Sequence, residues 1–328
     1  MMEPNSRVLD RSGESLRKGL MLSAIAATLM AWHFGLIGAL IQGGSWLGLT
    51  IGQLGLGLVP AVAILWLRML VTLPALVLLA PQLYRNTWHD LQDWIYNRER
   101  LLLLLMGSGV ALFCSQVLLY YSIGQVGPAL GAALLFLYPL TAVPLGALLR
   151  TERGLTPLGM LGLVAIAMGG FLTVRPTLSA TTPLAIWLGL LASIAFSSYI
   201  ALTNFSYRQR CHPIPVGLVQ FSTVTVLSTL VLLVRPLKLA NISWLSFAMW
   251  GIILGVVMLL VYLFSYSSLR IIGTRTAIVA ASTPVITSLI GWSFMPASPL
   301  EIIQWTGILL VTVGGIALGQ EKLSNSRL

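Results

Sequence analysis

The sequence predicts an all-α membrane protein with ten transmembrane helices in two inverted five-helix repeats. Three observations predict this fold: an apolar composition, ten apolar stretches of membrane-spanning length, and an internal repeat with exchanged charges. Hydrophobic residues make up 57% of the chain and charged residues only 9%, against roughly 25% charged residues in an ordinary soluble domain. A soluble protein of 328 residues could not cover its surface with so few charges.

Apolar stretches long enough to cross the hydrocarbon core as a helix, about 20 residues each, recur along the whole chain. Lipid requires every backbone polar group to be paired internally, so stretches of this length form helices rather than barrel strands. The connectors are short and polar, which leaves no separate soluble domain. The ten expected helices cover residues 20–41, 59–79, 101–122, 127–149, 156–174, 183–205, 213–234, 245–269, 273–295 and 300–320.

The first stretch follows Arg17 and Lys18 and therefore resembles a signal peptide. Its apolar run exceeds the roughly 7–15-residue core of a signal, so we expect an uncleaved first helix. The second stretch carries Arg68 near its middle, and the fourth and ninth carry Pro139 and Pro284. The remaining stretches are predicted from their length and apolar composition.

An internal repeat links the two halves of the chain. Residues 121–170 and 266–315 align without a gap at a constant offset of 145. The matched positions fall at the same depth of the corresponding helices, and membrane proteins built from two such halves are most often transporters. The identical pairs are Tyr121/Tyr266, Ser122/Ser267, Ala132/Ala277, Pro139/Pro284, Gly146/Gly291, Leu155/Leu300, Gly162/Gly307, Gly169/Gly314 and Gly170/Gly315.

The basic residues predict the orientation. With ten helices both termini lie on one side, and an excess of Lys and Arg marks the cytoplasmic side. Placing the termini inside puts fifteen basic residues in the inside segments, against Arg175, Arg235 and Lys238 outside. Topology therefore accounts for the net charge of +10, and no nucleic-acid partner is needed. We expect a multi-pass protein of the bacterial inner membrane with both termini cytoplasmic.

The charges also predict that the second half is inverted relative to the first. The connector after the third helix has no basic residue, whereas its counterpart after the eighth carries Arg270 and Arg275. The connector after the fourth helix carries Arg150 and Arg153, whereas its counterpart 295–298 carries none. Equivalent connectors thus face opposite sides, as in an inverted-topology repeat. The expected organisation is a cytoplasmic segment 1–19, repeats 20–174 and 183–320, and a cytoplasmic tail 321–328.

The chain resembles the EamA branch of the drug/metabolite transporter superfamily over residues 20–320. Segment 149–153 resembles that branch's L-G-E-R-L helix end, with Thr151 in place of the glycine. Pro139 and Pro284 match its fourth- and ninth-helix prolines, and the glycines of the fifth and tenth helices match as well. Trp32 and Arg68 resemble its first-helix Trp and second-helix Arg. The Gly-rich segment 43–58 and the long connector 80–100 depart from the pattern.

Two readily ionisable residues, His33 and Arg68, lie within the expected helices, close to the membrane midplane. Charge there is costly, so such residues usually face the bundle interior and mark a pathway. Arg68 is a candidate to bind a carboxylate or phosphate of a substrate. Its alternative is a structural role, donating to backbone carbonyls opened by Pro60 or Pro74. For His33, substrate or proton binding competes with one hydrogen bond between helices.

Pro139 and Pro284 are candidate helix breaks with a gating role. Each removes a backbone donor and frees the carbonyl four residues earlier, at Leu135 and Ala280. A freed carbonyl at this depth either lines a cavity or is satisfied by neighbours. We therefore expect a kink at each proline, and direct substrate contact is compatible with it.

Aromatic and polar side chains at matching depths are candidates for the wall of a substrate cavity. Such walls suit amphiphilic metabolites such as amino acids, whereas helix packing or an interfacial belt is the alternative for each residue. Together with His33 and Arg68, the candidate cavity residues are Trp32, Gln116, Tyr120, Tyr138, Tyr199 and Tyr262.

The leading functional hypothesis is a secondary transporter that moves small organic metabolites, amino acids or related compounds, by alternating access. The EamA resemblance implies export. The alternatives are an exchanger of phosphorylated or nucleotide-linked sugars, and a non-transporting scaffold or sensor. The sequence contains no nucleotide-binding loop, metal-ligand cluster or nucleophile–base pair, so we expect no enzyme, cofactor or metal site. The expected partners are membrane lipid and a small substrate; a homodimer is compatible with the sequence.

Overall fold

The computed structural model describes residues 4–46, 49–50, 53–148, 155–178, 183–237, 243–294 and 300–325. In these ranges, ten helical segments are long and apolar enough to cross a membrane, as the sequence predicts. The all-α membrane fold is therefore confirmed. The segments are Glu14–Gln42, Leu58–Leu83, Glu99–Val126, Pro128–Leu148, Pro157–Thr177, Pro183–Arg208, Pro213–Val234, Trp244–Ile272, Thr276–Phe294 and Ile302–Glu321.

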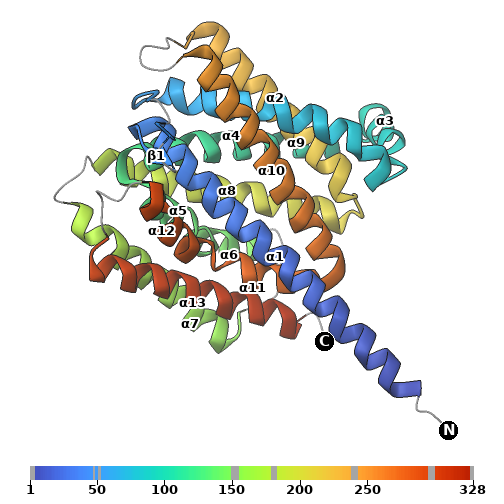
Figure 1. Ribbon diagram of the computed structural model, residues 1–328. Coiled ribbons are helices and arrows are strands. Elements are labelled where there is room, and N and C mark those ends of the chain that lie inside the picture. Colours follow the sequence, from blue (N-terminus) through green and yellow to red (C-terminus); the bar gives the residue numbers. More distant parts are fainter. Residues whose placement is uncertain are drawn as a thin grey trace.

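The elements of the first half run from α1 to α7 (Figure 1). They are α1 Pro4–Gln42, β1 Ser45–Trp46, β2 Leu49–Thr50, α2 Leu58–Leu83, α3 Thr87–Asn97, α4 Glu99–Val126, α5 Pro128–Leu135, α6 Pro139–Leu148 and α7 Pro157–Val174. After the 3-10 turn η1 Arg175–Leu178, the second half comprises α8 Pro183–Arg208, α9 Pro213–Val234, α10 Trp244–Ile272, η2 Gly273–Arg275, α11 Thr276–Ala280, α12 Thr283–Phe294 and α13 Ile302–Asn325. Segment 149–153, which carries part of the family resemblance, lies outside the described residues.

Three helices begin after a residue whose side chain caps the helix N-terminus. Thr156, His212 and Ser243 each accept a hydrogen bond from a backbone N–H of the following first turn, in α7, α9 and α10. Pro157 and Pro213 occupy the first helical position, where no N–H is required.

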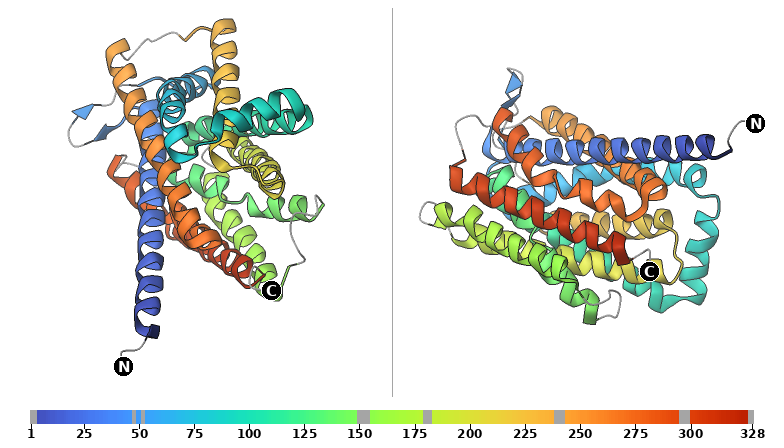
Figure 2. Two further views of the ribbon diagram at one scale, coloured as in Figure 1. Left: turned by 90° about the vertical axis from the view of Figure 1, so that its right-hand side faces the viewer. Right: turned by 90° about the horizontal axis from the view of Figure 1, so that it is seen from below.

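The first helix begins earlier than its expected transmembrane part. α1 starts at Pro4, and its N-terminal end projects beyond the bundle (Figures 1 and 2). Packing begins at Gly19, whose carbonyl accepts a hydrogen bond of 2.9 Å from Ser268 on α10. Beyond α1, β1 and β2 form a short antiparallel hairpin within the Gly-rich segment 43–58. Gly43 and Gly55 there both have a φ of +81°, which favours glycine.

Both mid-span prolines break their helices, as the sequence predicts. The fourth span divides into α5 and α6 around residues 136–138, and the ninth into α11 and α12 around 281–282. The freed carbonyls are satisfied within the protein: Leu135 O accepts from the Tyr138 N–H at 3.0 Å, and Ala280 O accepts from Thr283 Oγ1 at 2.7 Å. Since both carbonyls have partners, the prolines act here through helix geometry.

The fifth and tenth spans, α7 and α13, pack closely through their glycines. A methyl group added at Gly162 would lie 3.0 Å from the Gly314 carbonyl oxygen, and one at Gly169 would lie 2.6 Å from the Gly307 carbonyl oxygen. Larger side chains would force the two backbones apart. The earlier glycine of α7 contacts the later glycine of α13 and the reverse, so the two helices run antiparallel. In the repeat alignment, with its offset of 145, Gly162 corresponds to Gly307 and Gly169 to Gly314, so the two glycine contacts are equivalent.

The two halves of the chain are interleaved rather than side by side. Helix α4 packs on α8, α1 on α10, and α2 on both α9 and α10. At one end of the bundle, Glu321 of α13 is buried at 5% exposure, and its Oε1 accepts from the Thr156 N–H at the start of α7. The C-terminal end and the connector before α7 therefore lie at the same end, as an even number of spans requires. Glu321 belongs to α13 rather than to a separate tail.

Candidate functional site

Four of the predicted site residues meet around the guanidinium of Arg68. Arg68 on α2 is 1% exposed, and its Nη1 donates to Tyr120 Oη, to His33 Nε2 at 3.0 Å and, at 3.5 Å, to Gln116 Oε1. His33 comes from α1, whereas Gln116 and Tyr120 lie one turn apart on α4. We call these four residues the Arg68 cluster. The three partners are at most 3% exposed.

The backbone of Arg68 is held by a close approach between α2 and α10. Thr72 Oγ1 lies 3.0 Å from the Arg68 carbonyl and 3.0 Å from the Gly255 carbonyl of α10. A side chain at position 255 would come within 2.9 Å of the Arg68 carbonyl, so glycine permits this contact. The guanidinium binds side chains of α1 and α4, rather than carbonyls opened by Pro60 or Pro74 as the structural alternative held. The guanidinium of Arg68 thus joins three helices of the first half, while the backbone of α2 at this point lies against α10 of the second half.

The hydrogen bonds assign the protons of His33. Arginine donates and does not accept, so His33 Nε2 is the acceptor of the Arg68 contact. The Tyr120 hydroxyl, 3.1 Å from the same nitrogen, then acts as a donor to it. In the neutral imidazole the remaining nitrogen, Nδ1, carries the proton. That buried N–H has no hydrogen-bond partner among the described residues, and the same holds for Arg68 Nε–H.

The charge of Arg68 has no carboxylate partner within the described residues, where ion pairs involve Lys18, His89 and Arg98. The ring of Tyr120, whose centroid lies 5.6 Å from the Arg68 guanidinium carbon, provides a cation–π contact. Burying a charge is expensive unless an opposite charge and hydrogen bonds compensate it. The cluster therefore combines an uncompensated cation with two unused donors, which is the chemistry that receives an anionic or strongly accepting group.

Two further candidates lie in a row of aromatic rings beside the break in the fourth span. Tyr138 contacts Phe136 and Phe196 at centroid distances of 6.2 and 5.2 Å, and Phe196 contacts Tyr199 at 5.6 Å. We call these four residues the aromatic row. Thr141 and Ser197 hold it in place, because Ser197 Oγ donates to the Tyr138 carbonyl at 2.7 Å and lies 2.5 Å from Thr141 Oγ1.

All four rings of the aromatic row are half-buried, although they lie well inside their spans. Phe136, Phe196 and Tyr199 of the aromatic row pack against the apolar core that contains Tyr120 of the Arg68 cluster.

Trp32 and Tyr262 pack against the same apolar core, and each also contacts an aromatic ring outside both groups. Trp32 packs edge-on against Phe294 of α12 at a centroid distance of 6.1 Å. Tyr262 donates from its hydroxyl to the Pro213 carbonyl at 3.0 Å and packs edge-on against Phe221 at 5.4 Å. Since the hydroxyl of Tyr262 is engaged with α9, its contacts are those of a helix-packing residue.

Sequence reasoning missed Phe136 and Phe196, which complete the aromatic row. Phe136 lies in the helix break three residues before Pro139, and Phe196 lies one turn from Tyr199 on the same face of α8. Their proximity to predicted residues at helical spacing is the signal that could have found them.

A separate aromatic assembly, also missed, lies beyond the end of α2. The rings of Tyr84 and His212 stack at a centroid distance of 3.7 Å, and His212 Nε2 lies 3.3 Å from the Tyr266 hydroxyl. His212 Nδ1 accepts from the Ile214 N–H at the start of α9. Burial lowers the pKa of His212, with Asp90 opposing the shift and Arg270 adding to it. The neutral ring thus joins the connector after α2 to α9 and α10.

The comparisons agree with a membrane transporter fold. No family model matches the sequence. A protein of Synechocystis sp. described as an uncharacterized transporter is 29% identical over 318 residues, which cover 94% of this chain and 95% of that protein. A solved crystal structure shares the fold with a TM-score of 0.51 at 16% identity, over 93% of this chain and 97% of that one. The chain is thus similar, over nearly its whole length, to a protein described as a transporter.

Proposed function

We propose that the chain is a secondary transporter that exports small organic metabolites from the cytoplasm by alternating access. The relative described as a transporter and the ten spans support the general function. The resemblance to the EamA branch of the drug/metabolite transporter superfamily supports the direction and the substrate range. The proposed location is the bacterial inner membrane, with both termini cytoplasmic, as the distribution of basic residues suggests.

We place the substrate site at the Arg68 cluster and the aromatic row. The observation that carries this proposal is the buried guanidinium of Arg68, which has no carboxylate partner in the described ranges. A substrate carboxylate would compensate the charge and accept from Arg68 Nε–H or His33 Nδ1–H. Apolar parts of the substrate would contact the aromatic row, as in ligand sites that combine apolar walls with a few polar groups.

The proposed substrates are amino acids or related carboxylates. Among the described residues, Arg68 is the one buried Lys or Arg side chain, which suits one carboxylate better than a diphosphate with several charges. A charge-assisted contact of this kind contributes about 1.5–3 kcal/mol. Neutral His33 adds a donor without adding charge, and so favours a small monoanion or zwitterion.

Alternating access would follow from inverted repeats that exchange conformations. The antiparallel contact of α7 with α13 supports such repeats, because the pair Gly162–Gly314 becomes the pair Gly307–Gly169 under the offset of 145. Transporters of this type move one repeat or bundle against the other around a central site. The breaks at Pro139 and Pro284, one in each half, are the proposed positions where the spans bend. Superposition of residues 20–174 on 183–320 should require a rotation of about 180° about an axis that lies in the membrane plane.

Reconstituted protein tests the function. Purified protein in proteoliposomes loaded with an unlabelled amino-acid mixture should accumulate one or more labelled amino acids by counterflow, and protein-free vesicles should not. Arg68→Ala should need a higher substrate concentration for the same exchange. The matched control is Gln220→Met, because Gln220 is also buried but its amide already donates to Ser108 and Thr203 at 2.8 Å each. If neither a carboxylate nor any other metabolite in a broad panel is exchanged, the transporter proposal fails and a scaffold or sensor role replaces it.

A further inference from the structure

Helix α3, in the long connector between the second and third spans, has no role in the proposed transport site. It is 11 residues long and lies across the bundle end, at a steep angle to the spans on either side (Figures 1 and 2). Three residues separate it from the end of α2, and one residue, Arg98, separates it from the start of α4. Helix α3 therefore lies at the level where two membrane spans end.

One side of α3 is fixed to the protein. Trp94 is 3% exposed and packs in a small apolar cluster with Leu101, Leu105 and Val216 of α4 and α9. Thr87, also buried, donates from its hydroxyl to the Tyr84 carbonyl at 2.6 Å. These contacts set the rotation of α3 about its own axis, so the directions of its other two sides are determined.

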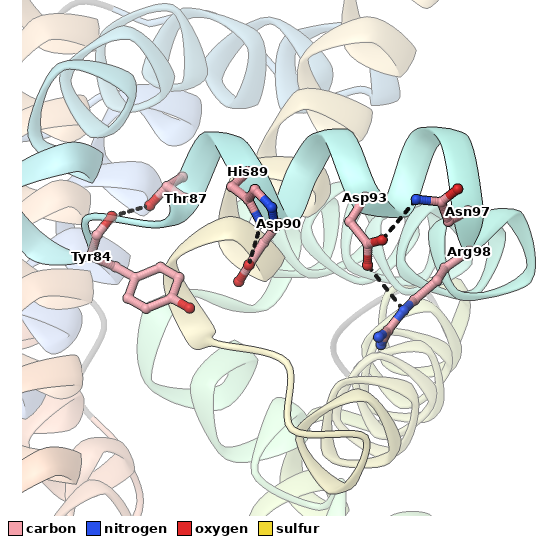
Figure 3. A network of polar contacts seen from close by, with 7 residues as sticks. All are labelled: Tyr84, Thr87, His89, Asp90, Asp93, Asn97 and Arg98. Carbon is pink, nitrogen blue, oxygen red and sulfur yellow. Dashed lines mark hydrogen bonds and ion pairs between the residues drawn. The ribbon is translucent and has the colours of Figure 1, made fainter.

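A second side of α3 is polar. At 100° per residue, His89, Asp93 and Asn97 follow one another along the helix (Figure 3). His89 is 84% exposed, Asn97 donates to Asp93 at 3.0 Å, and Asp93 pairs with Arg98 at 3.0 Å. This side has the composition of a water-facing surface.

The third side of α3 is apolar, aromatic and exposed. Trp88, Ile95 and Tyr96 are 45%, 52% and 79% exposed. Trp88 and Ile95 lie at i and i+7 and share one face of the helix, whereas Tyr96, about 80° further round than Trp88, lies at the border with the polar side. Three sides, facing protein, water and a third medium, are typical of an interfacial helix at the edge of a membrane protein.

We propose that α3 lies in the headgroup region of the bilayer, with Trp88, Ile95 and Tyr96 inserted at the boundary with the acyl chains. The position of α3 carries this proposal, because it lies between the end of α2 and the start of α4, and both of these spans carry exposed leucines near it. Leu78 on α2 and Leu103 on α4, each within two turns of the connector, are 75% and 66% exposed. Trp and Tyr favour this depth because their rings are amphipathic.

Charge is not the dominant attraction for this surface. The segment 85–100 carries three arginines and three carboxylates, and the pair of Asp93 with Arg98 is internal to it. Apolar insertion should therefore fix the depth of α3, and the depth should be the same in vesicles with and without an anionic lipid.

Site-directed spin labelling tests the proposal independently of transport. In a full-length background with Cys114→Ser and Cys211→Ser, nitroxides are placed one at a time through Trp88→Cys, Ile95→Cys and Tyr96→Cys. The matched controls on the polar side are Asp93→Cys and Asn97→Cys. Power saturation is measured with oxygen, which concentrates in lipid, and with a water-soluble nickel chelate. The vesicles are phosphatidylcholine, with or without phosphatidylglycerol.

The labels at 88, 95 and 96 should be relaxed more by oxygen than by the nickel chelate, and the control labels should show the reverse. Equal accessibility to the nickel chelate on both sides would mean that α3 lies in water, and would overturn the proposal. Shielding of the apolar side from both reagents would show a protein contact there, such as a second copy, and would also overturn it. A lipid position seen with phosphatidylglycerol alone would contradict apolar insertion.

Discussion

Replacement of Arg68 should weaken substrate affinity while leaving the fold intact. In Arg68→Ala the substrate loses a desolvated, charge-assisted contact of about 1.5–3 kcal/mol, which corresponds to a roughly ten- to hundred-fold rise in Kd. Arg68→Lys keeps the charge but loses the planar fork of donors, so its affinity should lie between those of the wild type and the alanine variant.

The structure explains why the variant should still fold. His33 Nε2 and Tyr120 Oη lie 3.1 Å apart and can keep their mutual hydrogen bond without the arginine. Removing Arg68 also removes the cost of burying a cation that has no carboxylate partner in the described part of the chain. Loss of the Gln116 contact is minor, because at 3.5 Å it is long for a hydrogen bond.

The assay is thermal unfolding in detergent with increasing substrate, at matched protein amounts. A ligand at 100 times its Kd stabilises the folded state by about 2.7 kcal/mol, so the substrate concentration needed for a given rise in Tm reports the affinity. For Arg68→Ala we expect an unchanged Tm without ligand. The substrate concentration needed for a given rise in Tm should be roughly ten- to hundred-fold higher than for the wild type. An unchanged requirement would refute the anchor role, and a collapse of the ligand-free Tm would assign Arg68 to structure.

Three other predictions concern packing, pH and topology. Gly169→Ala should destabilise the protein by about 1–3 kcal/mol through overpacking, whereas Gly107→Ala should not, because its added methyl group meets its nearest neighbour only at 4.0 Å; thermal unfolding of both variants checks this. Burial lowers the pKa of His212, so the folded state should lose stability as pH falls through the ordinary histidine pKa of about 6.5. His212→Asn should reduce this loss, as measured by unfolding between about pH 7.5 and 5. In a cysteine-free background, Trp46→Cys should react with an impermeant thiol reagent in intact cells and Arg210→Cys should not; labelling at 210 would contradict the proposed orientation.

The spans and their breaks follow from the sequence, because each depends on local chemistry. A run of about 20 apolar residues is sufficient to indicate a spanning helix, and the missing N–H of Pro139 or Pro284 is sufficient to indicate a break. The short helix α3 was not predicted, since its apolar residues are mixed with polar ones in three sectors and resemble an irregular connector. A helix whose sides face protein, lipid and water does not show a single apolar stripe in its sequence.

The candidate site could be predicted only in part. Depth within the span singled out His33 and Arg68, because few ionisable residues lie in the middle of any apolar stretch. Their meeting with Tyr120 depends on how α1, α2 and α4 pack, which the helical period of each sequence segment does not determine. For the same reason the sequence does not reveal the contact of Tyr262, whose hydroxyl donates to the Pro213 carbonyl at 3.0 Å across a separation of 49 residues. A tyrosine's depth does not tell whether its hydroxyl faces a cavity or a neighbouring helix.

Exchange of a substrate and of its amidated analogue, by wild-type and Arg68→Ala protein in proteoliposomes, tests the central claim most directly. If the carboxylate binds Arg68, wild-type protein should exchange the carboxylate form with roughly ten- to hundred-fold higher apparent affinity than the neutral amide. The alanine variant should treat the two nearly alike, because each change removes the same contact. Equal discrimination against the amide by both proteins would contradict the claim and place carboxylate recognition elsewhere in the chain.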